Sequence, residues 1–445
     1  MKTIIHTLKQ LLLIFLFSLI SCSFSFSAFA RDREDSQARL EKLKETPGAG
    51  WQLKSSGGLQ YMDPADKRYW FALTGVIRID ETLFMLKARN RQGDFPTGSH
   101  IRKFEIDAVG GIGQDWNYNL GLDFSLGNEG LRFQLEDTWV AYSGFCENLE
   151  IFLGRHSGMW FGLDSSISTS WYPFLERSAL ANAFYPGDGL GLLVDYWTDC
   201  SGFTFLALQP DRGTRIVTND NTNRRYGNDK WLGMARFTVA PLHEKGDVWH
   251  FGISGAYRQN TAFLNGFGVS DFAFSTRPEA RARNTAELVS TGDLQVNQAY
   301  QFDVEAARQW GPFLLEAEYA QATVGRLGDP QNQGRIRVYG WNVLAQYMIT
   351  GEIHSYDVRD GNFGGIEVEC PYGAWEIAAR YDYLNLNDKN VRGGTEQDFG
   401  VGLNWYVNNN VRLSANYIRA YINPANDTTR RKLDIIAARL QIKFE

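Results

Sequence analysis

Residues 396–421 read EQDFGVGLNWYVNNNVRLSANYIRAY, with large apolar side chains at every second position on both sides of Asn408–Asn410. Successive side chains of a β-strand point to opposite faces, so this alternation predicts a hairpin of two antiparallel strands. One face of the hairpin is apolar, and the other carries Asp398, Asn404 and Arg412. The pattern alone does not decide whether the apolar face meets the core of a soluble sandwich or lipid.

The same alternation recurs along most of the chain. It is clear in DWNYNLGLDFSLG (115–127), AWEIAARYDYLNL (374–386) and KLDIIAARLQIKFE (432–445). Membrane barrels are built from alternating runs of this kind, each roughly ten residues long, and the chain contains about sixteen of them. We expect the strands near 69–85, 101–111, 115–127, 131–143, 149–155, 188–197, 201–209, 230–240, 247–258, 298–308, 312–324, 336–350, 373–385, 395–407, 411–421 and 432–444.

The connections between these segments sort by length. Those after the second, fourth, sixth, eighth, tenth and fourteenth segments are short, whereas those after the first and after the odd segments from the fifth to the fifteenth are longer. Outer-membrane barrels show this parity because their periplasmic turns are short and their outer loops are long. Two connections depart from it. We interpret 128–130 as a tight outer loop and 351–372 as an unusual periplasmic segment.

The sequence therefore predicts an all-β fold, a transmembrane antiparallel β-barrel with a water-filled lumen that long loops narrow. Only a closed barrel satisfies every backbone polar group when strands cross a bilayer. Beyond the N-terminus no run of about 18 apolar residues exists, which excludes a helical membrane protein. The outward residues should include Tyr118, Phe124, Trp375, Tyr381, Phe399 and Leu403, and the lumen residues Asn119, Asp123, Arg380, Asp382 and Asn404.

The first 50 residues are expected to lie outside the barrel, which would span 51–445. Lys2 and Lys9 precede or flank an apolar run, and Ala28-Phe29-Ala30 gives a small-x-small site, so residues 1–30 resemble a secretory signal peptide. A lipoprotein cleavage box at 19–22 is the alternative. Residues 31–50 are charged, and we interpret them as a periplasmic N-terminal arm or a disordered lead-in.

The composition narrows the function further. The formal charge is −6, so the chain lacks the basic excess typical of nucleic-acid binders. No cofactor-binding motif or metal-ligand spacing appears, and we expect neither. Cys146, Cys200 and Cys370 all fall on the periplasmic side of the strand map. A disulfide between Cys146 and Cys200 is predicted, because that compartment is oxidising and turns at a rim can lean together.

Several stretches resemble the phosphate-selective porin O and P family. The resemblance begins near residue 53 and runs to the C-terminus. It is clearest in LERSALANAFYPGDGLG (175–191), FSTRPEARARNTAELVSTG (274–292) and YMITGEIHSYDVRDGNFGGIE (347–367), and the order of these motifs also matches. The resemblance implies a sixteen-stranded barrel in the outer membrane of a Gram-negative bacterium. It also implies a homotrimer, contact with lipid and lipopolysaccharide, and passage of small anions such as phosphate or polyphosphate.

One position departs from the family. Where members carry a lysine at the entry to the third outer loop, this chain has GRHSGMW (154–160), with Ser157 at the lysine position. Anion pores rely on rings of Arg and Lys, so this difference leaves phosphate selectivity open. Arg155 and His156 add donors nearby.

The candidate pore residues are arginines. Residues 156–187 form the third outer loop, which in the family folds into the barrel, and Arg177 could face the constriction or pair with Glu176. Clustered guanidiniums hold phosphate-like groups, so the fifth outer loop is a second candidate region. Arg380 and Arg439 lie on lumen faces and could form a basic stripe along the wall, or they could pair with the neighbouring Asp382 or Glu376. The full set is Arg155, Arg177, Arg277, Arg281, Arg283, Arg380 and Arg439.

Two other functional classes remain open. A barrel enzyme would need a nucleophile with a base in reach, and the only tempting pair is His156 with Ser157. Adjacent residues of an extended chain point to opposite faces, which disfavours that pair. The other class is an adhesion or structural barrel with a plugged lumen, because the filling of a lumen is not visible in a sequence.

Overall fold

The computed structural model describes residues 50–53, 58–86, 95–124, 126–127, 130–131, 133–157, 161–210, 230–260, 271–281, 285–292, 294–326, 334–425, 427 and 429–444. The expected signal peptide and all but the last residue of the expected N-terminal arm lie outside these ranges. None of the described helices is long and apolar enough to cross a membrane.

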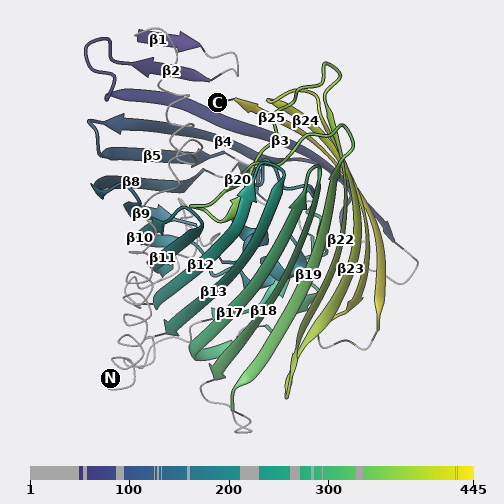
Figure 1. Cartoon of the computed structure of the whole chain (residues 1–445). Coiled ribbons are helices and arrows are strands. Elements are labelled where there is room, and N and C mark those ends of the chain that lie inside the picture. The colour runs from purple at the N-terminus through teal and green to yellow at the C-terminus, as the bar shows by residue number, and fades with distance from the viewer. Residues whose placement is uncertain are drawn as a thin grey trace. The chain divides into compact units, whose positions relative to one another are not determined.

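Sixteen antiparallel strands form a closed barrel (Figure 1). Each pairs with the next along the chain, and the last strand closes the ring by pairing Leu433–Phe444 with Gly75–Leu86 of the first. All sixteen predicted strands are therefore confirmed. They are β3 (Trp70–Leu86), β4 (Gly98–Ile112), β5 (Trp116–Asp123), β8 (Gln134–Cys146), β9 (Leu149–His156), β10 (Gly189–Trp197), β11 (Ser201–Pro210), β12 (Lys230–Glu244), β13 (Asp247–Asn260), β17 (Leu294–Trp310), β18 (Phe313–Arg326), β19 (Ile336–Met348), β22 (Ala374–Asp388), β23 (Val391–Tyr406), β24 (Val411–Asn423) and β25 (Arg431–Phe444).

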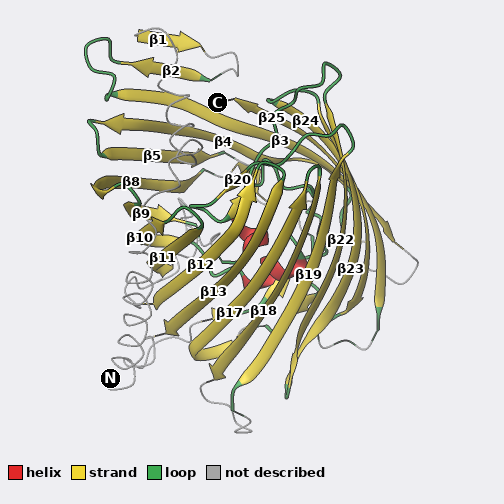
Figure 2. Cartoon of the chain, viewed as in Figure 1, coloured by secondary structure: helices red, strands yellow, loops and turns green. Residues whose placement is uncertain are grey.

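The remaining elements are short. β1 (Gly50–Leu53) and β2 (Leu59–Met62) form a hairpin on the start of β3, and β14 (Asp271–Phe272) pairs with β17. Three small hairpins join β6 (Leu126–Gly127) to β7 (Gly130–Leu131), β15 (Ser275–Thr276) to β16 (Val289–Ser290), and β20 (Tyr356–Asp357) to β21 (Asn362–Phe363). The helices α3 (Leu163–Ser166) and α4 (Ala179–Phe184) both belong to the connection between β9 and β10 (Figure 2).

The two faces of the strands separate as the alternation predicts. On β22 and β23, the outward Tyr381 and Phe399 are 39% and 48% exposed, whereas the lumen-facing Arg380 and Asp398 are at most 1% exposed. In the same way, Leu403 is exposed on the outer face and Asn404 is buried on the lumen face. Large apolar groups on the outside and polar groups inside are the arrangement of a barrel that meets lipid.

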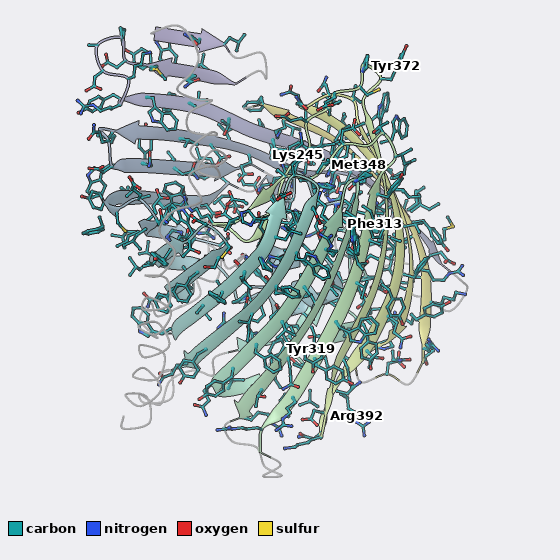
Figure 3. All side chains as sticks on the ribbon, in the orientation of Figure 1. Lys245, Phe313, Tyr319, Met348, Tyr372 and Arg392 are labelled. Atoms are coloured by element: carbon teal, nitrogen blue, oxygen red, sulfur yellow. The ribbon has the colours of Figure 1, made fainter. Side chains whose placement is uncertain are left out.

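The two ends of the barrel differ in their connections. Lys245, Met348 and Tyr372 mark the end with the short turns, and Arg392 lies at the opposite end (Figure 3). Two predicted loops are corrected. The tight outer loop expected at 128–130 is a longer connection, because β5 ends at Asp123 and β8 begins at Gln134. The connection after β22 was expected to be long, but β22 and β23 extend beyond the predicted ends and pair up to Asp388 and Val391. A bulge near Asn385 and a positive φ of 54° at Lys389 make this tight turn.

Candidate functional site

The connection between β9 and β10, residues 157–188, crosses the lumen and is called the crossing loop. Its middle reaches the wall formed by β23 and β24. The Leu175 N–H donates to Asn416 Oδ1 at 2.8 Å, and Asn404 Nδ2 donates to the Pro173 carbonyl at 2.9 Å. Arg412 Nη1 donates to the Tyr172 carbonyl at 3.0 Å. The expectation that this loop lies inside the barrel is confirmed.

Local features of the sequence shape the crossing loop. Gly162 precedes α3 as its N-cap residue with a φ of 83°, and a side chain there would meet the carboxylate of Glu318 on β18. The Ser178 side chain caps α4 by accepting a hydrogen bond of 3.0 Å from the Ala181 N–H. Asn342 Nδ2 on β19 donates to the Ser178 hydroxyl at 3.0 Å, so the cap is also tied to the barrel wall.

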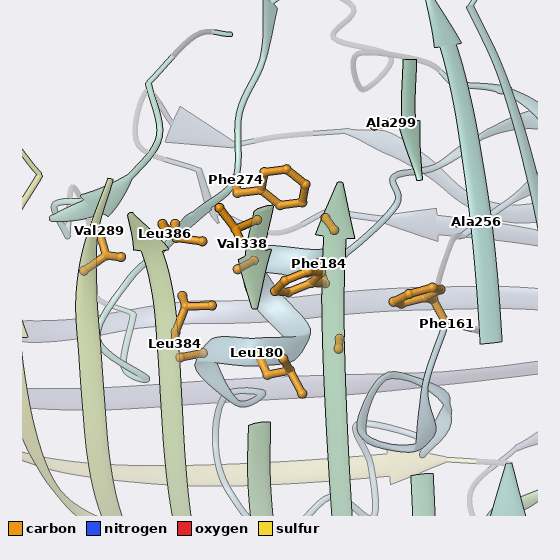
Figure 4. Packing of buried hydrophobic residues seen from close by; sticks show 14 of the residues in the cluster. Phe161, Leu180, Phe184, Ala256, Phe274, Val289, Ala299, Val338, Leu384 and Leu386 are labelled. Carbon is orange, nitrogen blue, oxygen red and sulfur yellow. The ribbon is translucent and has the colours of Figure 1, made fainter. Parts of the chain in front are cut away.

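Apolar side chains anchor the crossing loop and the fifth outer loop to the wall. Leu180 and Phe184 of α4 pack with Phe274 and Val289 of the loop between β13 and β17 (Figure 4). The inner faces of the surrounding strands complete the cluster with aliphatic residues, which are nearly all buried. These include Leu206, Leu232, Met234, Val324, Ile336, Val338, Leu384, Leu386, Ile418, Ile422, Leu433 and Ile435.

A second segment enters the lumen from the other end. Residues 349–373, called the inserted turn, carry Arg359, whose Nη2 lies 2.6 Å from Glu150 Oε2 and 3.3 Å from Asp195 Oδ2. Asn362 Nδ2 donates to the Ser166 carbonyl of the crossing loop at 2.9 Å. Phe363 packs in an apolar cluster with Leu163, Ile167, Tyr172 and Phe174 of the crossing loop. The inserted turn thus supports the crossing loop from the end of the barrel that carries the short turns.

Four guanidinium groups gather on the lumen faces of β24, β25, β3 and β4, and we call them the arginine cluster: Arg412, Arg439, Arg78 and Arg102. The strand register brings them together, because Gln441 lies opposite both Arg412 and Arg78, and Arg439 is two residues from it on the same face. Arg102 is the extra residue of a bulge in β4, between Lys103, the register partner of Arg78, and Ile101, the partner of Ile79. Its guanidinium reaches the crossing loop at Glu176.

Two members of the arginine cluster are neutralised by carboxylates. Arg439 forms two hydrogen bonds of 2.7 Å with Asp80. Arg102 binds Glu176 of the crossing loop with contacts of 2.6 and 3.1 Å. Burial opposes ionisation of the Glu176 carboxyl, but Arg102, with smaller contributions from Arg439 and Arg281, lowers its pKa to about 2.

The other two members contact neutral groups. Arg78 donates to Gln441 Oε1 at 2.8 Å, to the Thr169 hydroxyl at 2.8 Å and to the Ser170 hydroxyl at 3.0 Å. Arg412 donates to the Tyr172 carbonyl and lies over the Tyr406 ring. Within the described ranges neither forms an ion pair with a carboxylate. The crossing loop therefore meets the wall at a site with excess positive charge.

The five predicted pore arginines outside the last strands of the wall differ in their contacts. Arg155 lies 3.2 Å from Asp188, and Arg177 donates to the Asp164 and Ile167 carbonyls, so both brace the crossing loop. Arg277 pairs with Glu287 at 2.5 Å within its own loop. Arg281 is exposed and close enough to influence Glu176, and Arg283 lies outside the described residues.

The two predicted arginines on lumen faces, Arg380 and Arg439, are both paired with carboxylates. Arg380 is almost completely buried and binds Glu279 and, at 2.9 Å, Asp382. Arg439 is paired with Asp80 as described above. Sequence reasoning missed Arg78 and Arg102 as site residues and gave Arg412 no role. The alternation places Arg412 on the lumen face, but nothing in the sequence pattern indicates which arginines share a carboxylate.

The predicted disulfide is not formed, because Cys146, Cys200 and Cys370 are free thiols in the structure. Cys146 ends β8, and Cys200 lies in the turn after β10, so two strands separate them around the rim. At about 4.8 Å per strand this leaves roughly 10 Å, beyond the reach of about 7 Å between bridged α-carbons.

Ser157, considered above and disfavoured as a nucleophile beside His156, is bonded to Asp137. Ser157 donates its N–H to Asp137 Oδ1 at 2.7 Å, and its hydroxyl lies 3.3 Å from Asp137 Oδ2. No group of three or more His, Cys, Asp or Glu residues in the described part of the chain could hold a metal ion.

Comparisons with known proteins agree with this geometry. The model of the family described as phosphate-selective porin O and P matches residues 71–444. Porin O of Pseudomonas aeruginosa is 27% identical over 401 residues, which cover 84% of this chain and 88% of that protein. The anion-selective porin from Comamonas acidovorans superposes with a TM-score of 0.52 at 11% identity, covering 84% of this chain and 99% of that one. The outer membrane channel DcaP of Acinetobacter baumannii gives 0.52 at 10% identity, covering 89% and 100%.

Proposed function

Because the chain belongs to the phosphate-selective porin O and P family, we propose that this outer-membrane porin lets small anions, phosphate among them, diffuse passively across the membrane. The observation that carries the proposal is the arginine cluster. Arg78 and Arg412 bring two positive charges to the contact between the crossing loop and the wall, without carboxylates to neutralise them. Rings of Arg and Lys are the means by which anion pores favour their solutes.

We infer that the passage through the lumen runs along β4 and the crossing loop. On β4, His100, Arg102 and Lys103 keep partial exposure, and Ser168 and Thr169 of the crossing loop are also accessible. A phosphate oxygen accepts hydrogen bonds from guanidinium and hydroxyl groups alike. We assign the constriction to this strip, with Arg102 and the exposed Arg281 as the groups that a passing anion meets first.

Ser157 affects the expected preference for phosphate. It is buried and bonded to Asp137, so the position of the family's lysine contributes no positive charge to the lumen. Selectivity for anions then depends on the arginines of the wall. We expect anion preference to be retained and phosphate affinity to be weaker than in members that keep the lysine.

A homotrimer is part of the proposal. The strands on one side of the barrel are short. β9 and β10 have 8 and 9 residues, whereas β22 and β23 have 15 and 16. A spanning strand needs about 9–11 residues, so the side with the short strands is at the lower limit. Contact with neighbouring subunits would shield this side from lipid, and the rest of the surface would contact lipid and lipopolysaccharide.

One observation favours a second candidate, a plugged barrel with a structural role. Most lumen-facing side chains from β11 to β25 are buried beneath the crossing loop, the fifth outer loop and the inserted turn. Single-channel recording of the purified protein in a planar bilayer distinguishes the two. Discrete conductance steps in KCl with an anion-directed reversal potential support the porin, and the absence of steps from folded protein supports the plug.

A further inference from the structure

Glu176 is the carboxylate of the crossing loop that lies among the guanidiniums of the wall. Its Oε1 accepts a 2.6 Å hydrogen bond from Arg102 Nε, and its Oε2 accepts one of 3.1 Å from Arg102 Nη2. Arg439 Nη2 lies 3.9 Å from the same Oε1. The side chain is 12% exposed, as a group at the edge of an open passage would be.

Contacts other than this carboxylate also hold the crossing loop at residue 176. The Leu175 N–H is bound by Asn416, and the carbonyl of Glu176 accepts a 3.1 Å hydrogen bond from Arg380 Nη1. The following residue, Arg177, is fixed by carbonyls of its own loop. Backbone contacts on both sides thus hold residue 176, which leaves the charge of its side chain free to serve another purpose.

We propose that Glu176 is a specificity-determining residue whose carboxylate acts as a tethered anion. It occupies the guanidinium fork of Arg102, where a permeating oxyanion would otherwise bind, and so limits the affinity of the pore for such anions. The inference rests on the proposed function. A carboxylate and a phosphate make the same two-point contact with a guanidinium, so the two compete for the same donors.

The electrostatics agree with this role. Burial opposes ionisation, but Arg102 lowers the pKa of Glu176 to about 2, so its carboxylate is ionised at neutral pH. Arg281, which lowers that pKa from the fifth outer loop, is exposed and would contribute its charge to the vacated site.

The test compares Glu176→Gln with the wild type in planar bilayers, using inorganic phosphate as the probe. Glutamine keeps the shape and removes the charge. We expect the concentration of phosphate that halves the chloride current to fall about fivefold, the factor that a partly solvated charge pair contributes. The anion-to-cation permeability ratio should rise, and Glu176→Asp should stay near the wild type. Asp66→Asn is the matched control, because Asp66 forms an ion pair of 2.6 Å with Arg68 at an exposed turn before β3.

Each outcome is decisive. Unchanged phosphate block in Glu176→Gln, or an equal change in Asp66→Asn, overturns the inference. If neither Glu176→Gln nor Glu176→Ala yields a folded barrel by heat-modified gel mobility, the residue serves folding and the inference is wrong. Failure of the proposed function is distinguished by the wild type alone. If the wild-type pore prefers cations, the proposed function is contradicted, whatever the variants do.

Discussion

Arg439 in the last strand donates from Nε and Nη2 to the two oxygens of Asp80 in the first strand, each at 2.7 Å. Both side chains are at most 3% exposed, and they are direct partners in the register of β25 with β3. This two-point ion pair therefore lies on the seam that closes the barrel.

Replacing Arg439 should weaken the closure. Arg439→Ala leaves Asp80 as an unpaired buried carboxylate, which typically costs about 3–5 kcal/mol. We expect the temperature at which the folded barrel converts to the unfolded form on SDS gels to fall clearly. Arg68→Ala, which removes an exposed arginine from an ion pair, is the control and should change little. Equal melting temperatures for all three proteins would show that the seam does not depend on this pair.

Gly162 should be required for the entry of the crossing loop. Alanine at its φ of 83° costs about 1–2 kcal/mol, and its Cβ would also meet Glu318. Gly162→Ala is expected to lower thermal stability and to make single-channel current noisier, because the loop is held less firmly. Gly255→Ala on β13 is the matched control, since a side chain there meets open space. Quiet channels in Gly162→Ala would contradict the role assigned to the loop.

The inserted turn should loosen at high pH. Burial lowers the pKa of His354, but its hydrogen bond of 3.2 Å with Glu376 and the attraction of that carboxylate raise the pKa above the usual 6.5. A raised pKa means that the stabilisation is full below about 6.5 and is lost as pH rises through the raised value. Hydrogen exchange at 353–365, corrected for its intrinsic pH dependence, should be faster at pH 9 than at pH 6. His354→Gln should remove the difference, and a difference that persists in that variant would exclude His354 as its source.

The three described cysteines should all react. Cys146, Cys200 and Cys370 are free thiols, and the rim spacing separates the first two. Alkylation of denatured protein without reductant, followed by mass spectrometry of the peptides, should label all three. Loss of label from Cys146 and Cys200 together, restored by reductant, would show that the turns lean together after all.

The barrel was predictable because alternation and turn length are local properties of the sequence. Every strand could be placed, and the outward and inward sets on β22 and β23 were correct, since period two leaves no other arrangement. The end of β22 was misplaced because DKN at 388–390 resembles the start of a loop, and the tight turn depends on Lys389 adopting a positive φ.

The site was less predictable, because it is made by residues far apart in the chain. Arg102 meets Glu176, and Arg439 meets Asp80, only after the ring closes. Sequence reasoning correctly assigned Arg380 and Arg439 to the lumen, and Asp382 on the same strand is one partner of Arg380. The other carboxylate partners, Glu279 and Asp80, lie on other segments. Arg78 and Arg412 keep their charge because the nearby carboxylates pair with other arginines. Which arginines are paired is visible only in the three-dimensional structure.

The central claim is that positive charge at the contact of the crossing loop with the wall makes the pore prefer anions. The most direct measurement is the reversal potential in a KCl gradient for the wild type and for the double variant Arg78→Gln/Arg412→Gln, with Arg68→Gln as control. We predict an anion-selective wild type, an unchanged control, and a permeability ratio about fivefold lower in the double variant, as expected for charges that contribute ~1 kcal/mol. A cation-selective wild type, or the same ratio in all three folded proteins, would contradict the account.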